Sequence, residues 1–158
     1  MKVRVGFGFD VHQLKEGKEL WLGGIQLSHS KGAVGHSDAD VLIHAICDAL
    51  LGAAGMRDIG FHFPDTVAEF KGIDSKILLD RVSQLLKKEG YSIGNIDCTL
   101  VLEQPKINPH IDTMKKTLAS ILNVEVTDIG IKATTNEKMG FVGREEGVCA
   151  YAVALIQK

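Results

Sequence analysis

Residues 34–55 read VGHSDADVLIHAICDALLGAAG and carry a clear helical pattern. Apolar side chains recur with helical spacing at positions 41, 42, 45, 46, 49 and 50. Ser37 or Asp38 is suited to cap the start of this helix, and Gly55 to end it. The stretch therefore predicts a helix with one broad apolar face, which has to pack against another layer of the fold.

The segments around this helix predict a sheet for it to pack on. Residues 2–9 and 18–28 have strand character, and Gly23 with Gly24 divides the second of them into a tight hairpin. The later elements follow in order: a helix at 74–89 that starts at Asp74 or Ser75, a strand at 95–103, a helix with Asn108 as cap and Pro109 as first residue, and strands at 127–134 and 148–157. This order predicts one α+β domain over residues 1–158, with a mixed sheet and helices mainly on one face.

Composition excludes several classes of partner. The chain has 18 basic and 20 acidic residues, a net charge of −2 and no run of Lys or Arg, which argues against binding nucleic acid or a membrane surface through bulk charge. Cys47, Cys98 and Cys149 form no CxxC pair and lie within apolar runs, as buried thiols of a reducing compartment do. We expect a cytoplasmic protein, or one of the plastid stroma if a transit segment has been removed.

The first candidate for metal binding lies in GFGFDVHQL, residues 6–14. Asp10 and His12 are two residues apart, so in a strand they point to the same side, about 7 Å apart along the backbone. Both could reach one ion. The alternative is a histidine that is merely hydrogen-bonded at the end of a strand.

A polar stripe on the first helix strengthens the metal hypothesis. Asp40, His44 and Asp48 recur at intervals of four residues on an otherwise apolar helix. They could form an exposed face; alternatively, His44 joins Asp10 and His12. Two imidazoles and one carboxylate suit Zn²⁺ and leave a fourth position open for substrate. Asp40 or Asp48 could then orient an imidazole.

Two segments near this helix offer groups for an anion and for a polyol. His36 and Ser37 lie at the helix N-terminus, where free N–H groups and the helix dipole favour a phosphate. His36 could equally be an ordinary loop histidine. The segment RDIGFHFPDT, residues 57–66, has neither helical nor strand periodicity and is predicted to be a shaped loop. There Asp58 and Asp65 could accept hydrogen bonds from a polyol or simply form turns.

A third cluster lies in IKATTNEKMGFVGREEG, residues 131–147. Hydroxyl groups such as those of Thr134 and Thr135, with neighbouring backbone N–H groups, can hold phosphate oxygens. A carboxylate such as Glu137 can hold a hard cation like Mg²⁺ that bridges them. The alternative is a hydrophilic hairpin turn. On local chemistry alone, the sequence indicates a metal-assisted enzyme that acts on phosphates.

Taken together and in this order, these segments resemble the 2-C-methyl-D-erythritol 2,4-cyclodiphosphate synthase family of the non-mevalonate isoprenoid pathway. The resemblance covers nearly the whole chain. Its motifs are FGFDVH, HSDADVLIHAICDALLGAAGMRDIG, FPDT, FKGIDS, QPKINPHI and KATTNEKMGFVGREEG.

The resemblance implies a role for each motif. Asp10, His12 and His44 would bind one Zn²⁺ per subunit, and Glu137 a second divalent ion, Mg²⁺ or Mn²⁺. His36 and Thr135 would stabilise the transition state. Ser37 would contact a phosphate of the substrate, and Phe141 and Arg144 would make further contacts with it. The methylerythritol part would lie against Asp58, Ile59, Gly60, Phe63, Pro64 and Asp65. The cytidine end would lie against Leu102, Pro105, Lys106, Ile107, Asn108, Ala133 and Thr134.

The resemblance also implies a homotrimer with active sites between subunits, and a lyase reaction. The substrate 4-diphosphocytidyl-2-C-methyl-D-erythritol 2-phosphate would cyclise by metal-assisted intramolecular phosphoryl transfer and release CMP. Two alternatives remain open from the residues: a metal-dependent phosphohydrolase, and a non-catalytic trimer that binds isoprenoid diphosphates.

Overall fold

The computed structural model describes residues 1–158, and its main feature is a five-stranded sheet in the order β4-β1-β7-β5-β6. The strands are β1 (Val3–Glu16), β4 (Lys31–Val34), β5 (Ser92–Val101), β6 (Ile129–Thr134) and β7 (Gly147–Gln157). β5 and β6 run parallel, whereas the other neighbours are antiparallel. The predicted mixed sheet is therefore confirmed.

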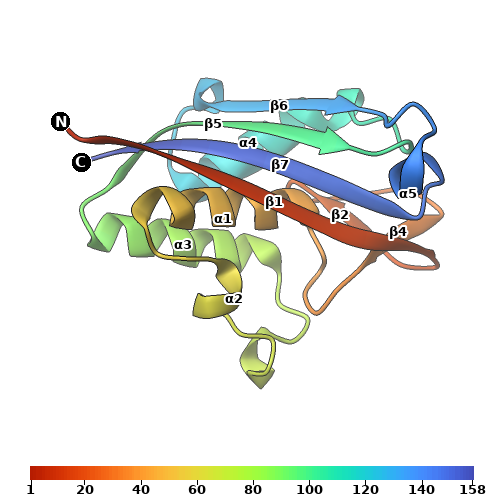
Figure 1. Cartoon of the computed structure of the whole chain (residues 1–158), viewed down its shortest axis with the longest axis horizontal. Helices are drawn as coiled ribbons and strands as arrows, with labels where there is room; N and C mark the ends of the chain where they lie inside the picture. Colours follow the sequence, from red (N-terminus) through yellow and green to blue (C-terminus); the bar gives the residue numbers. More distant parts are fainter.

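Three long helices cover one face of this sheet. They are α1 (Val41–Ala54), α3 (Ser75–Lys88) and α4 (Ile111–Leu122). Helix α1 packs on β1 and β7, α4 packs on β6, and α3 packs on both helices. In Figure 1 the strands cross in front of α1 and α4. Their buried apolar faces form the core, as the helical pattern of residues 41–50 predicted. None of the helices combines the length and the hydropathy that a membrane-spanning segment requires.

Short elements connect these layers. β2 (Leu20–Leu22) and β3 (Ile25–Leu27) form the predicted hairpin, in which Gly23 and Gly24 both have a positive φ that favours glycine. The other short elements are α2 (Ile59–His62), α5 (Gly140–Gly143) and the 3₁₀ turns η1 (Ala68–Phe70), η2 (Asn108–His110) and η3 (Val126–Asp128).

The structure corrects several predicted boundaries. Helix α1 begins after Asp40, whose side chain accepts a hydrogen bond from the N–H of Ile43, so neither Ser37 nor Asp38 is its cap. Asn108 does not cap α4: it begins η2, and α4 starts only after His110.

Several short elements were absent from the sequence prediction, among them β4 and α2. β4 has only four residues and no alternating pattern of apolar and polar side chains. It is a strand because its backbone pairs with residues 13–16 at the end of β1. Helix α2 lies within the segment that was predicted to be a loop. A single turn of helix carries too little periodicity to be recognised in a sequence.

The second face of the sheet is apolar and exposed. Every second side chain from Val3 to Val11 of β1 points away from the helices, and β7 adds two more beside them. The exposed apolar set is Val3, Val5, Phe7, Phe9, Val11, Tyr151 and Val153. The Phe9 and Tyr151 rings lie 5.1 Å apart between centroids. A contiguous apolar patch of this kind on a folded chain indicates an interaction surface.

Strand β1 and helix α1 are in direct backbone contact. A Cβ atom added to Gly8 would overlap the carbonyl oxygen of Ala45, and one added to Gly6 would overlap that of Ala49. Only glycine permits this approach. Because β1 lies so close to α1, the side chains that follow Gly8 on the strand can reach those on the helix.

Candidate metal centre and active site

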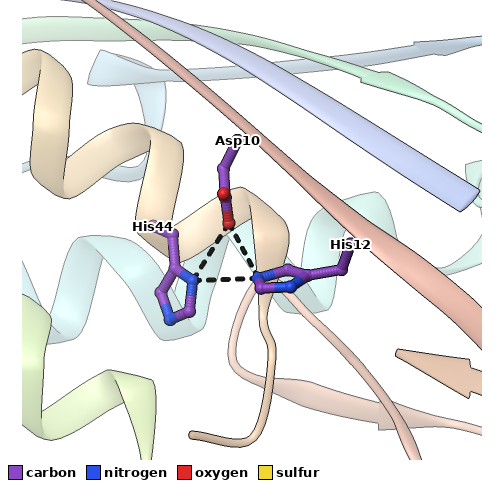
Figure 2. Close-up of side chains that lie close together, drawn as sticks. All are labelled: Asp10, His12 and His44. Atoms are coloured by element: carbon purple, nitrogen blue, oxygen red, sulfur yellow. Dashed lines mark hydrogen bonds and ion pairs between the residues drawn. The ribbon is translucent and has the colours of Figure 1, made fainter. Parts of the chain in front are cut away.

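Asp10, His12 and His44 converge on one point between β1 and α1 (Figure 2). The Oδ2 atom of Asp10 lies 2.9 Å from Nε2 of His12 and 3.0 Å from Nδ1 of His44. The two imidazole nitrogens are 3.2 Å apart. The predicted convergence of a strand pair with a helical histidine is therefore present in the structure.

The three donor atoms fit a zinc ion. Tetrahedral ligands bonded to zinc at about 2.0–2.1 Å lie about 3.3 Å from one another, close to the separations in this cluster. Burial alone would raise the pKa of Asp10, but hydrogen bonds to His12 and His44 outweigh it and lower that pKa to about 2. The Asp10 carboxylate is therefore ionised. Its oxygen and the two imidazole nitrogens, which are within hydrogen-bond distance of one another, are also placed so that all three could bind one cation.

The predicted partners of these imidazoles are wrong. Asp40 is fully buried but accepts its hydrogen bonds from the backbone N–H groups of Gly23, Gly24 and Ile43, at 3.0, 2.7 and 3.0 Å. It ties the β2–β3 hairpin to the start of α1 and does not contact an imidazole. His12 instead meets a backbone carbonyl, because its Nδ1 lies 3.1 Å from the oxygen of Val34 in β4.

Asp48 likewise contacts no imidazole. Its Oδ1 accepts a hydrogen bond from the N–H of Ile59 at 2.8 Å, which fastens the start of α2 to α1. Burial, with the nearby carboxylates of Asp58 and Asp10, raises the pKa of Asp48. Asp48, the last residue of the polar stripe on α1, therefore anchors the segment that begins α2 and does not orient a metal ligand.

A cavity of about 350 Å³ opens beside the cluster. Its walls bring together residues from distant parts of the sequence: Asp10, His12, His36, Ser37, His44, Ile59, Gly60, Phe63, Asp65, Phe70, Ile73 and Leu78. The side chains of His36 and Asp65 are both exposed and lie close together, with Nε2 of His36 3.6 Å from Oδ2 of Asp65. Most residues predicted to contact phosphate and polyol therefore lie around the candidate metal site.

Asp58 and Pro64 do not line this cavity. The side chain of Asp58 accepts from the N–H of Phe61 at 2.9 Å and so caps α2. This is the turn-forming role that the sequence left open for it. Phe70, Ile73 and Leu78 were not predicted, because nothing distinguishes three apolar residues near a helix start from ordinary core positions.

A second cavity, of about 320 Å³, lies where β5 and β6 end. Its lining contains every residue predicted for the cytidine end, and also Glu103 and Thr135, of which Thr135 was predicted to stabilise the transition state: Leu102, Glu103, Pro105, Lys106, Ile107, Asn108, Ala133, Thr134 and Thr135. The Glu103 carboxylate accepts from the N–H of Asn136 at 2.8 Å, and so anchors the loop that follows β6. The two cavities have no lining residue in common.

Three further predicted residues, like Asp58 and Pro64, lie outside both cavities. Glu137 is exposed on the loop after β6, and Phe141 is exposed on α5. Arg144 pairs with Glu146, with Nε and Oε1 3.0 Å apart. Within a single chain these side chains do not meet the candidate metal site.

Comparison with known proteins identifies the relatives of this fold and site. Residues 3–157 match the YgbB family. A Bacteroides thetaiotaomicron protein, 2-C-methyl-D-erythritol 2,4-cyclodiphosphate synthase, is 64% identical over the whole chain and over 99% of its own length.

This chain belongs to the YgbB family.

Solved structures agree with this membership. A 2C-methyl-D-erythritol-2,4-cyclodiphosphate synthase in a CDP-bound form has a TM-score of 0.91 at 34% identity, covering 98% of this chain and all of that one. The bifunctional IspDF of Campylobacter jejuni has a TM-score of 0.94 at 38% identity. The match covers 98% of this chain and 42% of that longer protein. The family resemblance in the ordered motifs is thus confirmed.

Proposed function

We propose that this chain is a 2-C-methyl-D-erythritol 2,4-cyclodiphosphate synthase, a phosphorus–oxygen lyase of the non-mevalonate isoprenoid pathway. It converts 4-diphosphocytidyl-2-C-methyl-D-erythritol 2-phosphate to the cyclic diphosphate and CMP. The observation that carries the proposal is the Asp10–His12–His44 cluster beside a cavity, in a chain whose full length matches a curated synthase.

Metal ions are part of this proposal. Zn²⁺ is held by Asp10, His12 and His44, whose separations of 2.9–3.2 Å suit it. A second divalent ion, Mg²⁺ or Mn²⁺, is held by the exposed carboxylate of Glu137. When bound, the two ions neutralise and orient the diphosphate oxygens.

The reaction needs no nucleophile from the protein. An oxygen of the 2-phosphate attacks the β-phosphorus, the new P–O bond closes the ring, and the bond from that phosphorus to the α-phosphate oxygen breaks with its electron pair leaving on CMP. The protein has to hold two mutually repelling anions in line. His36 and Thr135 stabilise the charge of the transition state, and Ser37 holds phosphate at the wall of the first cavity.

The two cavities divide the substrate between them. The methylerythritol lies in the first cavity, beside Ile59, Gly60 and Phe63. The cytidine end lies in the second, against the segment from Leu102 to Asn108 and beside Ala133. A CDP-bound relative with a TM-score of 0.91 supports a nucleotide site in this fold.

We further propose a homotrimer with active sites between subunits. Two observations support it. The exposed apolar face of β1 and β7 provides a surface for neighbouring copies. The two cavities, and the exposed Glu137, belong to one reaction yet share no wall within one chain. A boundary between subunits would let a neighbour complete the site.

Asp48 provides a test of how the methylerythritol cavity is held. In Asp48→Ala the N–H of Ile59 loses its acceptor, so the wall formed by Ile59 and Gly60 loosens. Loss of one hydrogen bond of about 1 kcal/mol corresponds to roughly a fivefold higher KM. Steady-state assays of CMP release measure it. Asp48→Asn keeps the acceptor oxygen and should keep KM within about twofold; an unchanged KM in Asp48→Ala would contradict this role.

The reaction itself is tested by ³¹P NMR of the purified protein with the proposed substrate, Zn²⁺ and Mg²⁺. We expect CMP together with the two coupled phosphorus signals of a cyclic diphosphate. A linear phosphate product would identify a metal-dependent phosphohydrolase and refute cyclisation. Bound but unchanged substrate would identify a non-catalytic trimer, for which isoprenoid diphosphates would be the next ligands to examine.

A further inference from the structure

His44 presents its two ring nitrogens to different surroundings. Nδ1 faces Asp10 at 3.0 Å, on the side of the candidate metal site. Nε2 points away from it, towards the hydroxyl oxygens of Ser75 at 2.9 Å and Ser37 at 3.1 Å. With only 7% of the residue exposed, water cannot readily take the place of these partners.

Ser75 is built into this position more firmly than Ser37. It is fully buried at the first turn of α3, and its N–H donates to Oδ2 of Asp38 at 2.9 Å. Its hydroxyl also contacts Oδ1 of the same carboxylate. Asp38 is itself fixed, because Oδ1 accepts from the N–H of Asp40 at 3.1 Å. A buried hydroxyl therefore stands between a carboxylate and an imidazole.

The direction of each hydrogen bond follows from the chemistry of the groups. A metal at Nδ1 uses the lone pair of that nitrogen, so the ring proton must be on Nε2. Nε2–H then donates to the oxygen of Ser75, and the hydroxyl proton of Ser75 has Asp38 as its acceptor. A carboxylate cannot donate, so the Ser75 hydroxyl has to donate to Asp38 and can only accept from His44. Of the two hydroxyl oxygens near Nε2, that of Ser75 is the nearer acceptor, at 2.9 Å against 3.1 Å for Ser37.

We propose that Ser75 and Asp38 are positioning residues that act through His44. They hold its ring with Nδ1 free for the metal, and they strengthen Nδ1 as a ligand by drawing on the Nε2 proton. This inference rests on the zinc site proposed above. Neither residue touches the metal or the substrate in this assignment, and Ser75 does not line the cavity.

The assignment also separates the roles of the two serines. Ser37 lines the cavity, is half-buried and already accepts from the N–H of Ala39 at 3.1 Å. With Ser75 as the acceptor for Nε2–H, the hydroxyl proton of Ser37 is available to a phosphate oxygen. Ser75 should therefore control zinc affinity, whereas Ser37 should control substrate affinity.

Helix α3 contains a matched control for Ser75. Ser83 lies on the same helix, is only 1% exposed, and its hydroxyl has no hydrogen-bond partner. Ser75→Ala and Ser83→Ala thus remove the same atom from equally buried sites. Only the first removes a hydrogen bond. Helix α3 should persist in Ser75→Ala because its cap is Asp74, which accepts from the N–H of Lys76.

The test measures zinc affinity by competition with a chromophoric chelator, without substrate. We expect Ser75→Ala to bind zinc about 10–100-fold more weakly than the unaltered chain, the usual effect of losing such a partner. Ser83→Ala should bind within about twofold of it. Ser37→Ala should bind zinc normally and show a raised KM. Equal zinc affinity in Ser75→Ala and Ser83→Ala would overturn the proposal, as would a loss seen only in Ser37→Ala.

A second measurement needs no substitution. In the zinc-loaded, unaltered chain, ¹⁵N NMR of the His44 ring should show a protonated Nε2 whose proton exchanges slowly with water. We call the hydrogen bonds from His44 through Ser75 to Asp38 the relay. An unprotonated Nε2 would overturn the relay even if Ser75→Ala did not fold. If the unaltered chain binds no zinc, the metal site and the relay both fail. If it binds zinc but Nε2 is bare, only the relay fails.

Discussion

His44→Ala is expected to abolish zinc retention and to lower turnover by about a thousandfold or more, as loss of several kcal/mol of charge stabilisation would. The remaining ligands, Asp10 and His12, both come from β1 and cannot enclose an ion from the helix side. Zinc content after dialysis and the rate of CMP release measure the two effects. The truncated side chain leaves the β1–α1 contact in place, so the fold and the proposed trimer should persist by circular dichroism and light scattering.

The control for this prediction is His29→Ala. His29 lies between β3 and β4, outside both cavities and outside the metal cluster. It should retain full zinc content and activity. If His44→Ala kept one zinc per subunit, the ligand assignment would be wrong. If it lost zinc but kept full turnover, zinc would have no part in the reaction.

Gly8→Ala is expected to destabilise the chain by at least about 3 kcal/mol, at or beyond the usual cost of overpacking a core. The new methyl group would meet the backbone of α1 at Ala45, and a backbone cannot move aside as a flexible side chain can. Strand and helix must therefore separate. Since Asp10 and His44 lie on opposite sides of this contact, any folded fraction should also bind zinc weakly.

Urea denaturation of the zinc-free chain measures this effect. Gly52→Ala is the matched control, because Gly52 lies on the same helix but only the carbonyl oxygen of Phe7, at 3.9 Å, is near its added Cβ. It should be neutral or stabilising by up to about 1 kcal/mol, the helix propensity gained by replacing glycine. Gly8→Ala with the stability of Gly52→Ala would show that β1 and α1 are not held as closely as described.

The convergence of Asp10, His12 and His44 could be predicted because each residue obeys a local period. Two residues along a strand restore the same face, and the helical stripe of polar residues needed a partner in the core. The boundaries of α1 were less accessible. Asp40 is its cap, and it also binds the hairpin glycines 16 and 17 residues earlier, a contact that no window of sequence reveals.

Ser75 and Asp38 show the limit of local reasoning more sharply. Each is a residue type that commonly caps helices, and each precedes or begins a helical pattern, so capping was a sufficient explanation for both. Their actual contact joins residues 37 positions apart. The only sign of this contact would have been a buried serine at the start of a helix that does not cap the helix. Ser75 can be recognised as such a residue only when the structure shows that Asp74 is the cap.

The pairing of β1 with β7 has a consequence for joining this chain to other proteins. Lys2 and Lys158 exchange two backbone hydrogen bonds, of 2.8 and 3.0 Å, so both ends lie at one corner of the molecule (Figure 1). Asp10 lies eight positions after Lys2, which is about 26 Å along the strand at about 3.3 Å per residue. A fused domain or a surface tether attached at either end would therefore lie away from the Asp10–His12–His44 cluster and the cavity beside it, and a short peptide bridge between the ends could make a circular chain.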